Sequence, residues 1–207
     1  EGVYLRDQAI WLTNKMGSRE VLPLADIQLP GVHNIENYMA AIAAVDGIVP
    51  DKCVRAVAKR FTGVEHRIEL IRTRDGVRWY NDSIASSPSR TIAGLNSFPE
   101  KVILIAGGKD KGISYAPLGP VVNDRVKLLL LCGKTAGVIR EAVEQAENYK
   151  GLEILDVADY HEAVFIADAR SQPGDVVILS PASTSFDRFA NFMERGQVFK
   201  AIVNELK

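Results

Sequence analysis

The spacing of hydrophobic residues changes along the chain, and this change divides the chain into two parts. Residues 3–27 hold short alternating runs, among them VYLRDQAIWLTN and REVLPL, around a turn at 15–18 (KMGS). Because successive side chains of a strand point to opposite faces, this alternation predicts small antiparallel strands.

Two helices are expected after these strands. Apolar residues then fall at helical spacing in two sets: Tyr38, Ala41, Ile42 and Val45, followed after Pro50-Asp51 by Val54, Val57, Ala58 and Phe61. Each helix needs a surface to cover with its apolar face. The pattern breaks over 61–66 (FTGVEH), which is the candidate domain boundary.

Beyond that boundary, strands and helices alternate. Strands are expected near 67–73, 76–81, 101–106, 126–132, 152–156 and 175–180, and helices near 87–97, 116–123, 135–147, 159–170 and 186–205. Several of the strands are continuous apolar runs (VILIA, VKLLLLC, VVILS), which is typical of parallel strands covered on both faces. The sequence therefore predicts an α/β fold with a Rossmann-like, mostly parallel sheet and helices on both faces.

Ligands of such sheets bind outside the carboxyl ends of the strands, so the loops at 81–87, 107–115, 132–135 and 180–186 are of most interest. In the first of them, Pro88 suits the first turn of a helix and Ser86 or Ser87 can cap it. A helix N-terminus of this kind favours an anion. Plain capping of a strand–helix turn is the alternative, although it leaves Asp82 and Ser83 without a role. Both interpretations stay open here.

The second loop, AGGKDKGIS (106–114), combines two glycines at a strand end with two lysines. Glycine lets a backbone approach a ligand closely, and lysine supplies a mobile charge for a phosphate or carboxylate. The loop matches neither GxxxxGK[ST], which is absent from the whole chain, nor GxGxxG. Two solvated lysines on a surface turn are the alternative.

The third loop leads into a helix that we expect to begin at 186. Its apolar stripe is expected to be core: Phe186, Phe189, Phe192, Met193 and Phe199. Gly196 lowers helix propensity by roughly 1 kcal/mol relative to alanine, so a close contact is expected there. Ser180, Ser183, Thr184 and Ser185 repeat the hydroxyl-rich pattern of the first loop. The two loops are therefore expected to border one crevice.

Composition and charge limit the classes of binding partner that are expected for this chain. The 207 residues carry a formal net charge of −1 with both signs interspersed, so no nucleic-acid-binding or membrane-surface patch is expected. No apolar run approaches the roughly 20 residues that span a bilayer. Cys53 and Cys132 lack CxxC or Cys/His spacing, and we interpret both as reduced, buried thiols of a cytoplasmic protein.

Several segments together resemble the Mur ligase family of peptidoglycan synthesis. They are GVHNIENYMAAIAA, FTGVEHRIE, GVRWYNDS, LIAGGKDKG and LSPASTSFDRFANFMERGQVF, in this order. The last one points to the branch that adds D-glutamate. The resemblance implies an ATP-dependent amide ligase, with 1–62 as the end of its central ATPase domain and 66–207 as its C-terminal domain. The family's P-loop, carbamylated lysine and magnesium ligands precede this region, so no catalytic residue or metal ligand is expected here, and the chain alone is expected to be inactive.

The resemblance also implies roles for individual residues. ATP, with Mg²⁺ held elsewhere, would lie near Asn34, Asn37, His66, Arg67 and Asp82. Bound D-glutamate would be surrounded by Ser86, Lys111, Ser185, Phe186 and Phe192, and would be joined to UDP-N-acetylmuramoyl-L-alanine. The full-length enzyme is expected to be a monomer. Simpler roles compete: Asn34 as a helix N-cap, Arg67 as a solvated charge and Phe192 as core.

One position departs from the family pattern. Many members read Asp-Ser-Lys-Ala-Thr-Asn where this chain has DSIASS at 82–87, so Ile84 stands in place of a lysine. Lys109, Lys111 and Arg90 are the nearby cations, and the details of glutamate binding stay open. A sibling ligase, such as another Mur ligase or a folylpolyglutamate synthase, is the competing enzyme. A non-catalytic α/β nucleotide-binding or interaction module is the alternative of a different class.

Overall fold

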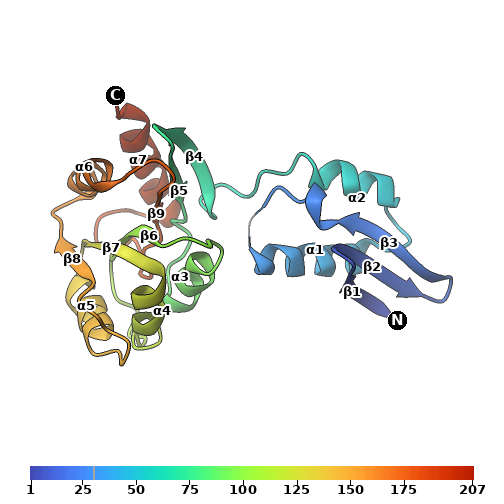
Figure 1. The fold of residues 1–207 in the computed structure, drawn as a ribbon, viewed down its shortest axis with the longest axis horizontal. Helices are drawn as coiled ribbons and strands as arrows, with labels where there is room; N and C mark the ends of the chain where they lie inside the picture. The colour runs from blue at the N-terminus through green and yellow to red at the C-terminus, as the bar shows by residue number, and fades with distance from the viewer. Residues whose placement is uncertain (30) are drawn as a thin grey trace. The chain divides into compact units, whose positions relative to one another are not determined.

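The computed structural model describes residues 1–29 and 31–207, which form two compact units (Figure 1). The first unit covers 1–63 and the second covers 64–207. Each unit has its own sheet and its own buried residues.

The first unit is a small antiparallel sheet with two helices. Its elements are β1 (Gly2–Arg6), β2 (Ala9–Asn14), β3 (Gly17–Pro23), the 3₁₀ helix η1 (Leu24–Asp26), α1 (Val32–Val45) and α2 (Asp51–Ala58). The strands lie in the order β1-β2-β3, as the alternating pattern predicted. Residues of β2, β3 and the two helices form the core: Ile10, Leu12, Val21, Leu22, Ile42 and Ala58.

The second unit is built on a six-stranded sheet. Its strands are β4 (Glu69–Arg74), β5 (Val77–Asn81), β6 (Val102–Ala106), β7 (Val126–Leu131), β8 (Glu153–Asp156) and β9 (Val176–Leu179), in the order β4-β5-β9-β6-β7-β8. The strand β4 is antiparallel to β5 at one edge, and all other pairs are parallel. The helices are α3 (Pro88–Leu95), α4 (Leu118–Arg125), α5 (Ala136–Glu144), α6 (Tyr160–Arg170) and α7 (Phe192–Glu205).

Helices cover both faces of this sheet, as predicted (Figure 1). Along β6, Val102, Leu104 and Ala106 pack with residues of α3, α4 and α5. The intervening Ile103 and Ile105 pack with residues of α6 and α7. Because both faces of the central strands are buried, the continuous apolar runs of the sequence are explained by the fold.

The last helix begins later than predicted. Asn191 caps it by accepting a hydrogen bond from Glu194 N (2.8 Å), and residues 186–191 form a turn instead of helix. The prediction of one apolar core stripe was therefore wrong: Phe186 is 61% exposed and Met193 is 49% exposed, whereas Phe199 is fully buried. Asn191 is a good N-cap residue and sets the start of the helix, whereas hydrophobic spacing alone would have placed the start earlier.

Three smaller predictions in the first unit were also wrong. Asn34 lies inside α1 and is not its cap, because the N-cap position belongs to Gly31 at φ 98°. Cys53 is exposed, since only one stripe of the short helix α2 is buried. Phe61 lies beyond the end of α2 and is 38% exposed.

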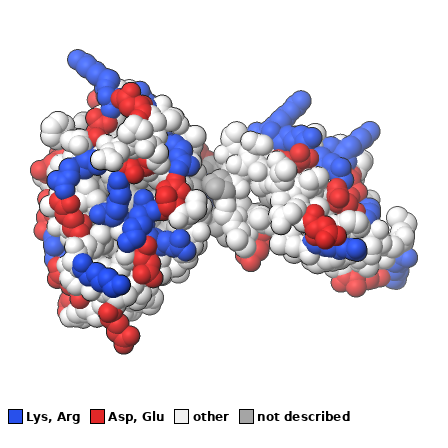
Figure 2. Space-filling view, viewed as in Figure 1, with Lys and Arg blue, Asp and Glu red and all other residues white. Residues whose placement is uncertain are grey.

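The surface carries mixed charge on the face that Figure 2 shows, where lysines and arginines alternate with acidic residues. Within the described residues, no helix is long and apolar enough to cross a membrane.

Candidate functional site

Three loops meet at the carboxyl ends of β5, β9 and β6, which are neighbours in the sheet. Asp82 N, just after β5, donates to Leu179 O at the end of β9 (2.8 Å). Gly107 N, just after β6, donates to Pro181 O (2.9 Å). The loops at 81–87, 107–115 and 180–186 are therefore joined through their backbones, at the edge where such sheets bind ligands.

The glycines of the second loop are required by this close packing. Gly107 has φ 114°, and a Cβ there would lie 1.8 Å from Cys132 O. Gly108 would place a Cβ 2.2 Å from Thr184 O. Lys109 and Thr184 then exchange two backbone hydrogen bonds (2.9 and 3.1 Å). Contact between loops thus accounts for both glycines, which the sequence had associated with a ligand.

Asp82 is the buried carboxylate of the site, only 3% exposed. Its Oδ2 accepts a hydrogen bond from Ser180 Oγ (2.8 Å), and its Oδ1 accepts one from Ile68 N (3.3 Å). Burial raises the pKa of Asp82 to about 7, against the opposing effects of Ser180, the Ile68 amide, Arg67 and Arg90. The Ser180 contact also confirms that the two hydroxyl-rich loops lie together.

His66 is buried beside Gly196, which lies in the second turn of α7. A Cβ on Gly196 would lie 2.2 Å from His66 Nδ1, which confirms that this helical glycine is required by a close contact. Asn81 Nδ2 lies 2.9 Å from the same nitrogen and 3.0 Å from Glu69 Oε2. The ring of Phe192 meets the imidazole edge-on, with centroids 6.0 Å apart.

Lys111 and Ser86, distant in sequence, come together. Lys111 Nζ donates to Ser86 Oγ (3.3 Å), and both side chains are accessible to solvent. Ser185 is 3% exposed, and its hydroxyl makes no hydrogen bond to any part of the chain that the structure describes. The Lys111 ammonium and the Ser86 hydroxyl can together bind a carboxylate, which needs a cation and hydrogen-bond donors.

The remaining residues predicted to bind ATP or D-glutamate lie in different parts of the chain and differ in exposure. Arg67 is exposed, and Phe186 extends into solvent. Asn34 and Asn37 belong to α1 in the first unit, where Asn34 is buried and Asn37 is exposed. Ser87 occupies the N-cap position of α3 without a capping hydrogen bond, while Pro88 begins the helix as expected.

A buried arginine was missed by the sequence interpretation. Arg195 of α7 is fully buried and donates to Ser83 Oγ (3.0 Å), Ser83 O (2.8 Å) and Ser183 O (3.0 Å). Burial lowers the pKa of its guanidinium, although arginine stays charged at physiological pH. The signal was present in the sequence: a charged residue beside Gly196, which itself marks a crowded part of the helix.

A cluster of buried hydroxyl groups lies beside the glycine turn, and two of its members, Thr135 and Tyr115, were not predicted from the sequence. Ser183 Oγ lies 2.8 Å from Thr135 Oγ1 and 2.9 Å from Tyr115 Oη. Thr135 Oγ1 accepts a hydrogen bond from Gly108 N (3.0 Å). These residues come from three different loops, and only tertiary structure brings them together.

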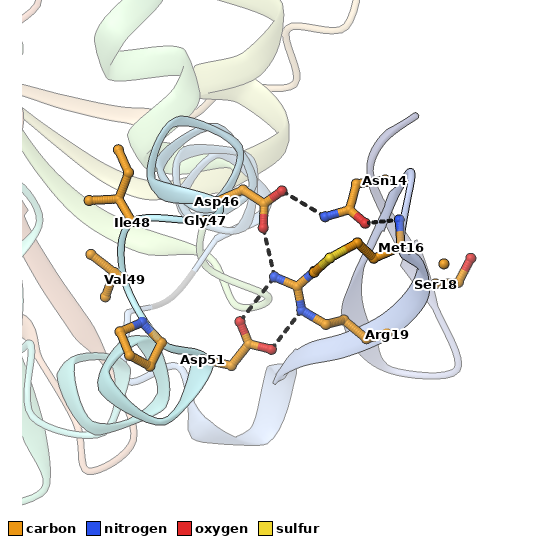
Figure 3. Close-up of a pocket in the computed structure, with 11 residues that line it drawn as sticks. Asn14, Met16, Ser18, Arg19, Asp46, Gly47, Ile48, Val49 and Asp51 are labelled. Atoms are coloured by element: carbon orange, nitrogen blue, oxygen red, sulfur yellow. Dashed lines mark hydrogen bonds and ion pairs between the residues drawn. The ribbon is translucent and has the colours of Figure 1, made fainter.

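Two further groups of polar residues are already paired within the chain. Glu65, His66 and Glu69 have ligand atoms within 4.8 Å of one another, yet Lys200 Nζ binds both carboxylates (2.9 and 2.5 Å). A pocket of about 500 Å³ in the first unit surrounds Arg19, which bonds to Asp46 (2.7 Å) and Asp51 (2.8 Å) (Figure 3). Because these charges neutralise each other, neither group is the better candidate site.

Known proteins resemble this chain at two levels. Two curated relatives are named UDP-N-acetylmuramoylalanine–D-glutamate ligase. The protein from Acetivibrio thermocellus is 51% identical over 100% of this chain and 45% of its own length. The protein from Symbiobacterium thermophilum is 50% identical over 97% of this chain and 44% of its own length. The chain thus spans somewhat less than half the length of these relatives.

Solved structures share the fold at lower identity. A UDP-N-acetylmuramate–alanine ligase from Thermotoga maritima superposes with a TM-score of 0.68 at 15% identity, covering 99% of this chain and 46% of its own. The FolC protein of E. coli in complex with ADP gives 0.67 at 17% identity, covering 97% and 45%. A family model described as Mur ligase, glutamate ligase domain, matches residues 66–183, which is more than half of the sequence. The chain belongs to the Mur ligase family.

Proposed function

We propose that this chain is the C-terminal part of an ATP-dependent ligase that joins D-glutamate to UDP-N-acetylmuramoyl-L-alanine. The names of the relatives, at about half identity over the whole chain, give the proposal its substrates. The observation that carries it is the contact of Lys111 with Ser86 across two loops, at the carboxyl edge where β5, β9 and β6 lie side by side. A dicarboxylic amino acid needs such a cation and hydroxyls.

In the proposed reaction, ATP phosphorylates the alanyl carboxylate, and the amine of D-glutamate then attacks the acyl phosphate. A C–N bond forms while the C–O bond to phosphate breaks, so phosphate leaves. Residues of this chain act by binding and orientation, which can contribute strongly to such reactions. Lys111, Ser86 and Ser185 hold the amino acid, with Phe186 and Phe192 beside it.

The nucleotide lies, in this proposal, near Asn34, Asn37, His66, Arg67 and Asp82. The structure of FolC with ADP bound supports a nucleotide role for the shared fold. Mg²⁺, held by residues outside this chain, would neutralise phosphate charge. Residues 1–62 would form the end of the ATPase domain and 66–207 the C-terminal domain of a monomeric, cytoplasmic enzyme, because its nucleotide substrates are cytoplasmic.

A sibling ligase remains the second candidate, favoured by the shared fold of the alanine ligase and FolC. The two candidates differ in the amino acid they consume. Phosphate release by the full-length protein, measured with UDP-N-acetylmuramoyl-L-alanine and ATP, should require D-glutamate. A requirement for another amino acid would support the sibling, and the 207-residue chain alone should release none.

The substitution Lys111→Ala tests the amino-acid site within that assay. A hydrogen bond to a charged group contributes roughly 1.5–3 kcal/mol, so the KM for D-glutamate should rise about ten- to a hundredfold. The KM for ATP should change far less. Lys101→Ala is the matched control, because Lys101 is an exposed lysine just before the opposite end of β6. A rise in the ATP KM instead would reassign this loop to the nucleotide.

A further inference from the structure

Arg195 is a buried cation without a buried acidic partner. Among the residues that the structure describes, its guanidinium forms no salt bridge. It donates to oxygens of Ser83 and Ser183, and the partly buried Asp187 and the buried Tyr160 also lie near it. Burying a charge is costly unless hydrogen bonds compensate for the lost water. The burial of Arg195 therefore costs stability, which its hydrogen bonds to the loops must offset.

The partners of Arg195 belong to the three loops of the candidate site. Ser83 follows β5, and Ser183 follows β9. Gly108 follows β6 and packs against the same guanidinium, since a Cβ on it would lie 3.2 Å from Arg195 Nη1. A single planar group thus contacts all three loops at once, from the first turns of α7.

Neighbouring contacts strengthen this arrangement. Ser83 Oγ accepts from Arg195 Nε and itself donates to Phe192 O (2.7 Å), so the loop after β5 is bound twice to α7. Ser183 Oγ contacts Thr135 and Tyr115, which carry the connection to the loops after β7 and β6. Lysine cannot replace this fork, because its ammonium is a compact point charge that cannot span separate acceptors in one plane.

We propose that Arg195 is a positioning residue that fixes the loops at 81–87, 107–115 and 180–186 in the geometry that receives the amino-acid substrate. This role deepens the proposed function and rests on it for the identity of the substrate. Arg195 itself acts through Ser83, Ser183 and the glycine turn. The inferred site residues Ser86, Lys111 and Ser185 each lie within three residues of one of these contacts.

Hydrogen exchange of the 207-residue chain tests the arrangement without any assay of activity. In Arg195→Lys, amides of all three loops should exchange at least about tenfold faster, measured relative to the amides of β7. Arg72→Lys is the matched control, because Arg72 Nη1 donates to three carbonyls at the other end of α7, those of Val203, Asn204 and Leu206. It should leave the three loops unchanged.

A second variant, Ser83→Ala, provides the test if Arg195→Lys does not fold. Ser83→Ala removes the hydroxyl between Arg195 and Phe192 but keeps the carbonyl contact, so it should accelerate exchange in the same loops by a smaller factor. Faster exchange confined to α7, or spread evenly over the whole second unit, would overturn the proposal.

Kinetics of the full-length protein then separate positioning from general stability. Arg195→Lys should raise the KM for D-glutamate about tenfold at a temperature where the variant is fully folded, with the KM for ATP within about twofold of wild type. An unchanged KM for D-glutamate would overturn the positioning role. A wild-type protein without D-glutamate-dependent activity would instead refute the proposed function, and the exchange experiment would still decide the loop arrangement.

Discussion

Both units have ion pairs at the surface, but among the described residues only the second unit also has buried charged side chains. In the first unit, Arg19 pairs with Asp46 and Asp51 at the surface, where the three side chains are 36%, 25% and 31% exposed. In the second unit, Asp82 and Arg195 are 3% and 0% exposed and are held by hydroxyls and backbone groups. Surface ion pairs contribute little to stability, whereas a buried charge depends on every contact it makes.

The difference follows from how each sheet is covered. A single buried cluster joins the three strands of the first unit to its two helices, whereas the sheet of the second unit has a buried cluster on each face. With both faces covered, the strand ends lie deep, and polar groups placed there must be satisfied within the protein. The candidate site lies at these strand ends, where buried polar groups depend on hydrogen bonds within the protein.

The largest expected effect concerns the units taken separately. Residues 64–207 should unfold cooperatively alone, because two apolar clusters support one sheet. Residues 1–63 should not, since chains of about 60 residues are marginal and Val32, Ile48 and Val57 are each more than half exposed. Thermal unfolding followed by circular dichroism would show this, and a sharp transition of the isolated 1–63 segment would contradict it.

Glycine substitutions should separate crowded from open positions. Gly107→Ala places a Cβ against Cys132 O at φ 114° and should destabilise the second unit by about 3 kcal/mol or more. Gly137→Ala is the control: it lies in α5 with nothing within 4 Å and should stabilise by roughly 0.5–1 kcal/mol. Denaturant unfolding measures both, and equal effects would show that packing at the glycine turn is looser than described.

Much of this second unit could be predicted from the sequence, because apolar runs and alternating elements report directly on burial. The start of the last helix could not, since hydrophobic spacing continued through Phe186 and only Asn191 marked the cap. Within the site, resemblance to a family supplied Lys111 and Ser86. Arg195, Thr135 and Tyr115 were not predicted, because their importance depends on contacts between residues distant in the chain.

The pH dependence of the second unit is expected to reflect Asp82. Its folded pKa of about 7 lies above the unfolded value, so between about pH 4 and 7 the folded state keeps a proton that the unfolded chain has lost. Stability should therefore fall as pH rises through this window, by on the order of a few kcal/mol, and stay level above it.

Asp82→Asn isolates that contribution from the other carboxylates. An amide can accept from Ile68 N and donate to Ser180 Oγ, which keeps its own bond to Thr91. The variant should gain stability relative to wild type as pH rises from 4 to 7, measured by urea unfolding at each pH. A difference between the two proteins that does not vary with pH would show that Asp82 titrates normally.

The smallest effect is expected in the first unit, and it has the opposite sign. Hydrogen bonds from Arg19 and Asn14 hold the pKa of Asp46 below its usual value, so its contribution is present above about pH 4 and is lost as pH falls through the folded pKa. Arg19→Gln should return this pKa toward that of a free aspartate. Carboxyl NMR titration of the 207-residue chain follows both residues at once: Asp46 should titrate low and respond to Arg19→Gln, whereas Asp82 should titrate high and not respond. If Asp46 and Asp82 titrated over the same pH range, the contrast between a carboxylate paired at the surface and one buried at the strand ends would not hold.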